Sequence, residues 1–116
     1  MISVATDYGI CRDNHRVTCV IDGDTFWLRG EKIRINNIDA PELLTPKCPA
    51  ELALAQQATV RLAELLGSGR LRVLRDGIDK YGRTLAVVQA GGADVGDGLV
   101  AEGLARTWSG RREPWC

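Results

Sequence analysis

Several features that would assign a small protein to a common class are missing from this chain. No apolar run approaches the roughly 18 residues that a membrane-spanning helix requires, so we expect no association with a membrane. The formal net charge is +0, with 15 Lys and Arg against 15 Asp and Glu, which argues against coating nucleic acid by bulk charge. A local basic pocket remains compatible with this balance. Low-complexity tracts are absent too, which argues against disorder.

Zinc ligands are scarce. His15 is the single histidine, and none of the 4 cysteines forms a C-x-x-C pair, so a four-ligand zinc site is not expected. An even number of cysteines in a small domain favours two disulfides over free thiols. Three pairings are possible, and we favour Cys11–Cys19, closing a short loop, and Cys48–Cys116, tying the tail to the body. Both assignments rest only on separation along the chain.

Disulfides predict export, to the periplasm or the medium. Residues 1–4 have neither the basic start nor the apolar stretch of a signal peptide, so the leader of an exported protein would be missing here. We expect a single domain over 1–116, with a cysteine-containing N-terminal segment (1–15) and an irregular C-terminal tail (107–116). We also expect a monomer without an obligate protein partner.

The first half of the chain predicts three strands in a meander. Apolar and polar positions alternate, with many β-branched residues, at 16–21, 25–29 and 32–38. Asp22-Gly23 is a hairpin signal between the first two strands. Pro41 ends the pattern, because proline cannot continue a strand.

The second half predicts a long helix, two strands and a short helix. Pro49 suits a first helical position, and residues 50–66 have apolar residues at helical spacing before Gly67. Strands are expected at 71–74 and 84–89, joined by a polar loop (76–83), and a helix at 95–104. Five short strands with a helix after the third is the order of an OB-fold barrel, so the fold class is mainly β with helices (α+β).

Acidic residues gather where predicted strands end. Asp22 and Asp24 follow the first strand, and Asp39 and Glu42 follow the third. In a meander these two ends lie at the same end of the sheet. Converging carboxylates without histidine favour a hard cation with oxygen ligands, Ca²⁺ or Mg²⁺. Taken alone, each segment is better explained as an Asp-Gly turn or a strand terminator.

Two arginines add groups that can bind phosphate. Arg34 lies between Ile33 and Ile35, so its side chain should leave the opposite face of the strand. Arg83 closes the segment 79–83, Asp-Lys-Tyr-Gly-Arg. A cation beside two guanidinium groups is what phosphoryl transfer requires. The plainer alternatives are a solvated strand face for Arg34 and an ordinary polar turn for 79–83.

Together these segments resemble a known family. The segments VIDGDT (20–25), IRINNIDAPE (33–42) and DKYGR (79–83) are similar, in order and spacing, to three motifs of the staphylococcal-nuclease-like (thermonuclease) family. The resemblance covers about residues 16 to 106. The cysteines and the Pro-Trp-Cys ending are similar to small exported members, some of them connected with succinoglycan biosynthesis.

The resemblance implies a Ca²⁺-dependent phosphodiesterase on an OB-fold, which cuts DNA and RNA and leaves 3′-phosphate ends. Asp24 and Asp39 would be carboxylate ligands of Ca²⁺, with the Ala40 backbone carbonyl as a third ligand. Asp22 would lie in the outer shell. Glu42 would be the general base for the attacking water.

The remaining roles implied by the resemblance concern the substrate. Arg34 and Arg83 would bind the phosphate and stabilise charge in the transition state. Lys80 and Tyr81 would border the nucleotide. Ala40 stands where the family has threonine, a change that keeps the backbone carbonyl.

Two other functions fit the sequence. One is a non-catalytic OB-fold module that binds nucleic acid or an anionic saccharide. The other is a disulfide-stapled structural or partner-binding domain, with the tail tryptophans as a contact surface. Catalysis is favoured because every charged position that would carry the chemistry is filled: Asp24, Arg34, Asp39, Glu42 and Arg83. We therefore predict a Ca²⁺-dependent nuclease acting on DNA, RNA or both.

Overall fold

The computed structural model describes residues 8–12 and 16–116, so most of the predicted N-terminal segment lies outside the described residues. The elements, in chain order, are β1 (Cys19–Asp22), β2 (Thr25–Leu28), β3 (Glu31–Ile35), β4 (Ile38–Asp39), α1 (Pro49–Leu66), β5 (Leu71–Ile78), β6 (Thr84–Ala90), β7 (Ala93–Asp94), α2 (Val95–Ala101) and β8 (Arg106–Thr107).

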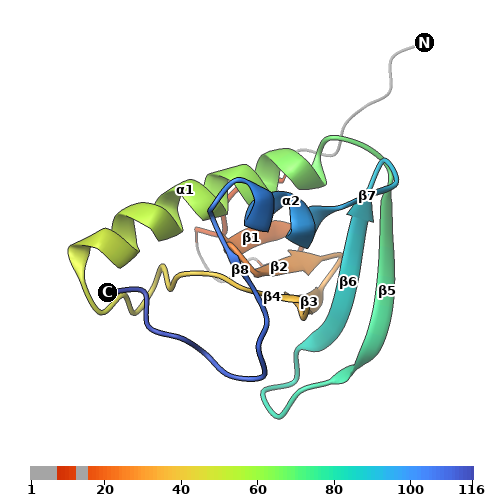
Figure 1. The fold of residues 1–116 in the computed structure, drawn as a ribbon. Coiled ribbons are helices and arrows are strands. Elements are labelled where there is room, and N and C mark those ends of the chain that lie inside the picture. The colour runs from red at the N-terminus through yellow and green to blue at the C-terminus, as the bar shows by residue number, and fades with distance from the viewer. Residues whose placement is uncertain (1–7, 13–15) are drawn as a thin grey trace.

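The fold is α+β and follows the predicted OB-type order. The main sheet runs β1-β2-β3-β6-β5, and all its pairs are antiparallel except β3–β6. Within the described residues β1 and β5 do not pair, so the barrel is not closed by hydrogen bonds. Figure 1 shows α1 lying across one end of the sheet, with α2 beside it. The core between them is fully buried and includes Phe26, Ile33, Ile35, Leu62 and Leu99.

The segment predicted as a third strand is divided in the structure. Asn36 and Asn37 form a turn, and Ile38 belongs to β4, which pairs with β8 rather than continuing β3. This short pairing brings the start of the C-terminal tail against the segment that carries Asp39. The backbone amide of Trp108 also donates to the Asn37 carbonyl, at 2.9 Å.

Two other element ends differ from the sequence prediction. β5 continues to Ile78, which pairs with Thr84 across a register shift, so the connecting loop shortens to residues 79–83. α2 ends at Ala101 because Gly103 adopts φ 75°, a left-handed conformation that a helix cannot contain. α1 agrees with prediction, with Pro49 in its first turn and Gly67 at its end.

Two disulfides join the cysteines in the expected pairs. Cys11 and Cys19 have their Cα atoms 5.0 Å apart, and Cys48 and Cys116 have theirs 6.1 Å apart. The second bridge spans 68 residues, and in the chain-entropy model a loop of that size stabilises a fold by about 4 kcal/mol. It brings the end of the chain back to the start of α1 (Figure 1). None of the helices in the described part is long and apolar enough to cross a membrane.

Candidate active site

The turn after β1 and the segment after β4 meet, as the meander predicts. The buried Asp24 carboxylate accepts the Ala40 amide at 3.1 Å through Oδ2 and the Thr25 hydroxyl at 2.9 Å through Oδ1. Gly23 allows this approach, because a Cβ there would lie 2.8 Å from the Ala58 Cβ and 2.9 Å from the Ala40 Cβ. Packing against α1 therefore fixes the Asp-Gly-Asp turn beside Ala40.

The negative charge of the carboxylates around this turn is not fully balanced by neighbouring cations. Burial and the neighbouring Asp24 carboxylate raise the pKa of Asp22 well above its usual range, and the charge of Glu42 adds to this. Burial likewise raises the pKa of Asp39, although the Arg112 guanidinium opposes the shift. These shifts mark a place where a bound cation lowers the electrostatic free energy.

The oxygen atoms of Asp24, Asp39 and Ala40 are ligands that suit a hard cation. Neither buried carboxylate oxygen of Asp39 accepts a hydrogen bond of normal geometry, although the Arg112 guanidinium lies 3.2 Å from Oδ1 and the Glu113 backbone amide also acts on this carboxylate. With Asp24 and the Ala40 carbonyl, the set consists entirely of oxygen atoms, as Ca²⁺ prefers. Across residues 8–12 and 16–116 no three His, Cys, Asp or Glu side chains are grouped to hold a metal. The fit therefore depends on two carboxylates and a backbone carbonyl.

Arg34 lies beside the carboxylates and is 6% exposed, so the solvated-face alternative is wrong. Its Nη1 donates to the Ile35 carbonyl, and its Nη2 is 3.7 Å from Asp24 Oδ2. The Trp108 ring covers the guanidinium, with its centroid 5.5 Å from the Arg34 Cζ. The buried ion pair holds Arg34 next to Asp24.

Arg83, Lys80 and Tyr81 form a separate group in the loop between β5 and β6. Arg83 Nε donates to Asp79 Oδ2 at 2.7 Å, and the amides of Tyr81 and Arg83 donate to Oδ1. Partial burial works against ionisation of Asp79, but the hydrogen bonds from Arg83 outweigh it and lower the pKa. The exposed Tyr81 ring contacts both cations. No hydrogen bond or ion pair in the described part of the chain joins this loop to the carboxylates.

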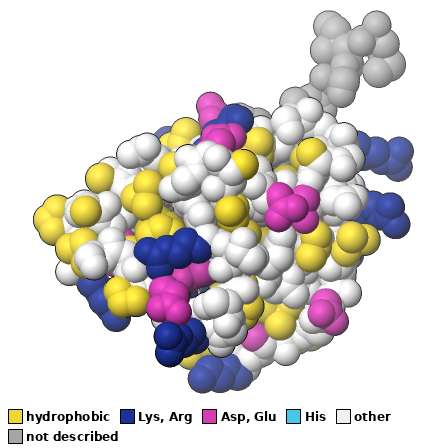
Figure 2. All heavy atoms as spheres, in the orientation of Figure 1, with side chains coloured by type: hydrophobic (Ala, Val, Ile, Leu, Met, Phe, Trp, Pro, Cys, Tyr) yellow, Lys and Arg dark blue, Asp and Glu magenta, His cyan; other side chains and the backbone are white. Residues whose placement is uncertain are grey.

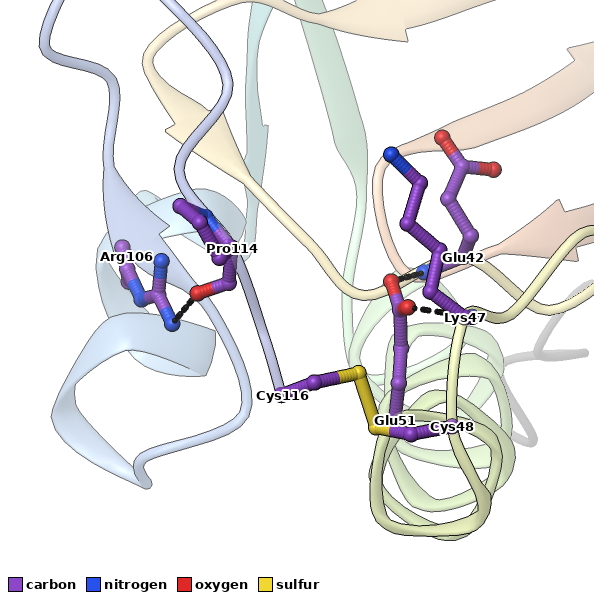
Figure 3. The surroundings of a disulfide bond; sticks show 7 residues. All are labelled: Glu42, Lys47, Cys48, Glu51, Arg106, Pro114 and Cys116. Atoms are coloured by element: carbon purple, nitrogen blue, oxygen red, sulfur yellow. Dashed lines mark hydrogen bonds between the residues drawn. A yellow bond between two sulfur atoms is a disulfide. The ribbon is translucent and has the colours of Figure 1, made fainter.

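Glu51 is a supporting residue that the sequence prediction missed. Its buried carboxylate accepts the amides of Glu42 and Lys47, at 2.9 and 2.8 Å (Figure 3). These two hydrogen bonds lower the pKa of Glu51 below its usual range. The first turn of α1 therefore fixes the backbone that carries Glu42. An acidic residue just after Pro49 was the available signal, but it is equally explained by the helix dipole.

Arg112 is the second missed residue. Its guanidinium lies 2.7 Å from Glu42 Oε1, 3.2 Å from Asp39 Oδ1 and 3.0 Å from the Ala40 carbonyl oxygen. The expected Cys48–Cys116 bridge was the available signal, because it brings the tail near residues 42–48. In Figure 2 basic and acidic side chains adjoin each other on the face shown.

Comparison with known proteins places this geometry in context. The model of the family described as staphylococcal nuclease homologue matches residues 32–114. A thermonuclease of Staphylococcus intermedius is 35% identical over 100 residues, which is 81% of this chain and 59% of that protein. Endonuclease YncB of Bacillus subtilis (strain 168) is 39% identical over 93 residues, 74% of this chain and 44% of YncB.

A third relative has a different kind of name. Succinoglycan biosynthesis protein ExoI of Rhizobium meliloti (strain 1021) is 33% identical over 91 residues, 74% of this chain and 48% of that protein. The chain thus spans roughly half the length of these three relatives, from 44% of YncB to 59% of the thermonuclease.

Proposed function

The chain belongs to the staphylococcal nuclease family, and from this premise we propose that it is a Ca²⁺-dependent phosphodiester hydrolase. The proposed reaction is endonucleolytic cleavage of DNA, RNA or both, leaving 3′-phosphate ends. The observation that carries the proposal is the convergence of the Asp24, Asp39 and Glu42 segments beside the buried Arg34. The relatives named thermonuclease and endonuclease support the same class of reaction.

The proposed cation ligands are oxygen atoms of the turn after β1 and the segment after β4. Asp24 and Asp39 would bind Ca²⁺ through their carboxylates, and Ala40 through its carbonyl, with Asp22 in the outer shell. The raised pKa of Asp22 and the buried Asp39 oxygens, which accept no hydrogen bond of normal geometry, support this assignment. Ca²⁺ bound there supplies positive charge for the scissile phosphate.

Glu42 is the proposed general base. It would take a proton from the water that attacks phosphorus, while the bond from phosphorus to the 5′-oxygen breaks and that oxygen takes up a proton. The half-buried Glu42 is anchored through its backbone by Glu51, so its side chain has to give up only the ion pair with Arg112 to turn towards a water. This anchoring supports the role.

Arg34 and Arg83 are the proposed phosphate-binding groups. Arg34 is held at the carboxylates by Asp24. Arg83 contacts Asp79 through Nε, so its Nη edge is available to phosphate oxygens. Lys80 and Tyr81, on the same loop, would border the nucleotide.

Cleavage of a single-stranded oligonucleotide tests the proposal directly. We expect cleavage at millimolar Ca²⁺, none with EGTA, and products whose ends are 3′-phosphates. A folded protein that leaves the oligonucleotide intact at millimolar Ca²⁺ would contradict the enzyme assignment.

One contact favours a second candidate function. Arg112 pairs with Glu42, and a base held in an ion pair is compatible with a non-catalytic module that binds nucleic acid or an anionic saccharide. The relative named for succinoglycan biosynthesis supports an anionic saccharide as the ligand of such a module. Binding of either polymer without cleavage in Ca²⁺ would identify this function.

The cellular setting follows from the disulfides. Two bridges in a small domain are typical of an oxidising compartment, so we propose that the protein is exported and acts as a monomer on nucleic acid outside the cytoplasm.

A further inference from the structure

We propose that Arg112 is a tethered competitor of the cation: it occupies the oxygen atoms that would bind Ca²⁺, and the Cys48–Cys116 disulfide keeps it there. The inference rests on the cation site proposed above. It assigns a regulatory role to the C-terminal tail, which the proposed chemistry does not use.

The competition follows from the atoms that Arg112 contacts. Its Nη2 is 3.0 Å from the Ala40 carbonyl oxygen and 3.2 Å from Asp39 Oδ1, two of the proposed ligands. Its Nη1 is 2.7 Å from Glu42 Oε1, the proposed base. A Ca²⁺ ion needs oxygen atoms at about 2.3–2.6 Å, so it would stand where the guanidinium now lies. Ca²⁺ at these ligands and Arg112 in its present position exclude each other.

The tail is held at both ends. At its start Thr107 pairs with Ile38 in β8–β4. At its end Cys116 is bonded to Cys48, the residue that precedes α1. Two fixed ends restrict the space that Arg112 can search, and this raises its effective concentration at the carboxylates.

Contacts of Arg106 with Pro114 and Trp115 fold the tail back on itself. Arg106 donates to the Pro114 carbonyl at 2.7 Å, shown in Figure 3, and its Cζ lies 3.6 Å from the Trp115 ring centroid. These contacts involve no carboxylate and hold residues on either side of Arg112, in addition to the Glu113 backbone amide that acts on Asp39. The Arg112 side chain can therefore leave without the tail unfolding.

Arg112 also has room to leave. Its side chain is 44% exposed, so the guanidinium regains water at little cost when it withdraws. A cavity of about 420 Å³ lies between the tail and the loop before α1, lined among others by Glu42, Lys47 and Trp115. Withdrawal into solvent or into this space needs no break in the disulfide.

The consequence is a threshold for the cation. If Arg112 occupies the ligands most of the time, the apparent Kd for Ca²⁺ rises by the inverse of the free fraction. An occupancy near nine-tenths corresponds to about a tenfold weaker affinity. The tail then keeps the site latent until Ca²⁺ is abundant.

Isothermal titration with Ca²⁺, in the absence of nucleic acid, tests the inference on the full chain. Arg112→Ala should bind Ca²⁺ about tenfold more tightly than the wild type. Arg111→Ala is the matched control: Arg111 is the preceding residue, its side chain is 80% exposed, and it pairs with Glu113 rather than with the site. The control should stay within about twofold of the wild type, because an exposed charge is screened by salt.

The tether is tested separately. In Cys48→Ser/Cys116→Ser, with Arg112 intact, Ca²⁺ should also bind more tightly than in the wild type. Adding Arg112→Ala to that pair should then bring a smaller gain than it does with the disulfide present. If the disulfide variant does not fold, by circular dichroism, the Arg112→Ala and Arg111→Ala pair decides the question alone.

The remaining outcomes separate this inference from the function it rests on. Equal affinities for Arg112→Ala and Arg111→Ala would overturn the inference and leave the Ca²⁺ site standing. Weaker binding by Arg112→Ala would also overturn it, since Arg112 would then position the ligands. A lack of Ca²⁺ binding in every folded variant would refute the Ca²⁺ site itself, and the competition with it.

Discussion

Glu42 can be tested without disturbing the residues that hold it, because Glu51 binds its backbone amide and not its side chain. Glu42→Gln should lower kcat on single-stranded DNA by about 10²–10⁴-fold, the range that general base catalysis contributes, with little change in the free energy of unfolding. The side chain loses only a partly exposed ion pair to Arg112. Single-turnover kinetics and urea unfolding measure the two effects.

The control is Glu64→Gln, since Glu64 lies on the exposed face of α1, away from the site, and pairs with Arg61. It should cleave DNA as the wild type does. A Glu42→Gln variant with wild-type kcat would contradict the assignment of the base.

Glu51 gives the molecule a pH dependence whose sign is fixed by its hydrogen bonds. The amides of Glu42 and Lys47 lower the pKa of Glu51 in the folded state, so the stabilisation is complete above the usual glutamate pKa. It is lost as the pH falls through the lower, folded value. Glu51→Gln should therefore unfold more easily than the wild type at pH 7, by about 2 kcal/mol, and the difference should shrink in acid. Urea unfolding across pH measures both effects.

Glu64→Gln serves as the control here as well, because its exposed carboxylate pairs with the side chain of Arg61. A Glu51→Gln variant as stable as Glu64→Gln at pH 7 would show that the two amides do not depend on this carboxylate.

The contacts of Glu51 and Arg112 could not be predicted from the sequence. The approach of Asp24 to the segment that carries Asp39 could be predicted, because each follows a predicted strand and a meander brings such ends together. Glu51 and Arg112 occupy positions, the first turn of a helix and an irregular tail, where charged residues are common in any protein. Their roles depend on contacts between segments that no local pattern encodes.

At the scale of elements, the turn between β1 and β2 is set by its contact with α1. Gly23→Ala would place a methyl group within 2.8 Å of the Ala58 Cβ and 2.9 Å of the Ala40 Cβ. Both neighbours are buried, so the backbone must shift. We expect a loss of about 1–3 kcal/mol, as for other overpacked positions, together with reduced cleavage because Asp24 moves with the turn.

Gly9→Ala is the matched control, because an added Cβ there meets no atom within 4 Å. Thermal melting of the two variants compares them directly. Equal melting temperatures would mean that the turn is not closely packed against α1.

The same scale explains which element ends could be predicted. The period of α1 and its flanking Pro49 and Gly67 located that helix within one residue. The end of β5 was missed because Arg75-Asp76-Gly77 has the composition of a loop. These residues extend the strand through pairing with β6, and a register shift accommodates the glycine at φ 86°. The free energy gained by pairing with β6 outweighs the low intrinsic strand propensity of these residues.

At the scale of the whole molecule, the balanced charge limits substrate binding. A chain of net charge +0 has few cations to spare for phosphates outside the site, so we expect a higher KM than a basic relative has. With about two phosphates neutralised on a single strand, KM should rise about sevenfold between about 50 and 200 mM salt. Steady-state kinetics at several salt concentrations would measure this, with kcat nearly constant. A KM insensitive to salt would argue against phosphate contacts.

The two disulfides also divide the chain into covalent rings. One ring closes residues 11–19 and the other closes 48–116, and the rings do not overlap. The stretch between them, 20–47, carries Asp22, Asp24, Asp39, Ala40 and Glu42. A single peptide-bond cut inside either ring leaves the molecule in one covalent piece, whereas a cut between the rings separates it into two. The stretch that carries the proposed cation ligands and the general base is thus one that neither disulfide would hold together after a cut, whereas Arg83 lies inside the second ring.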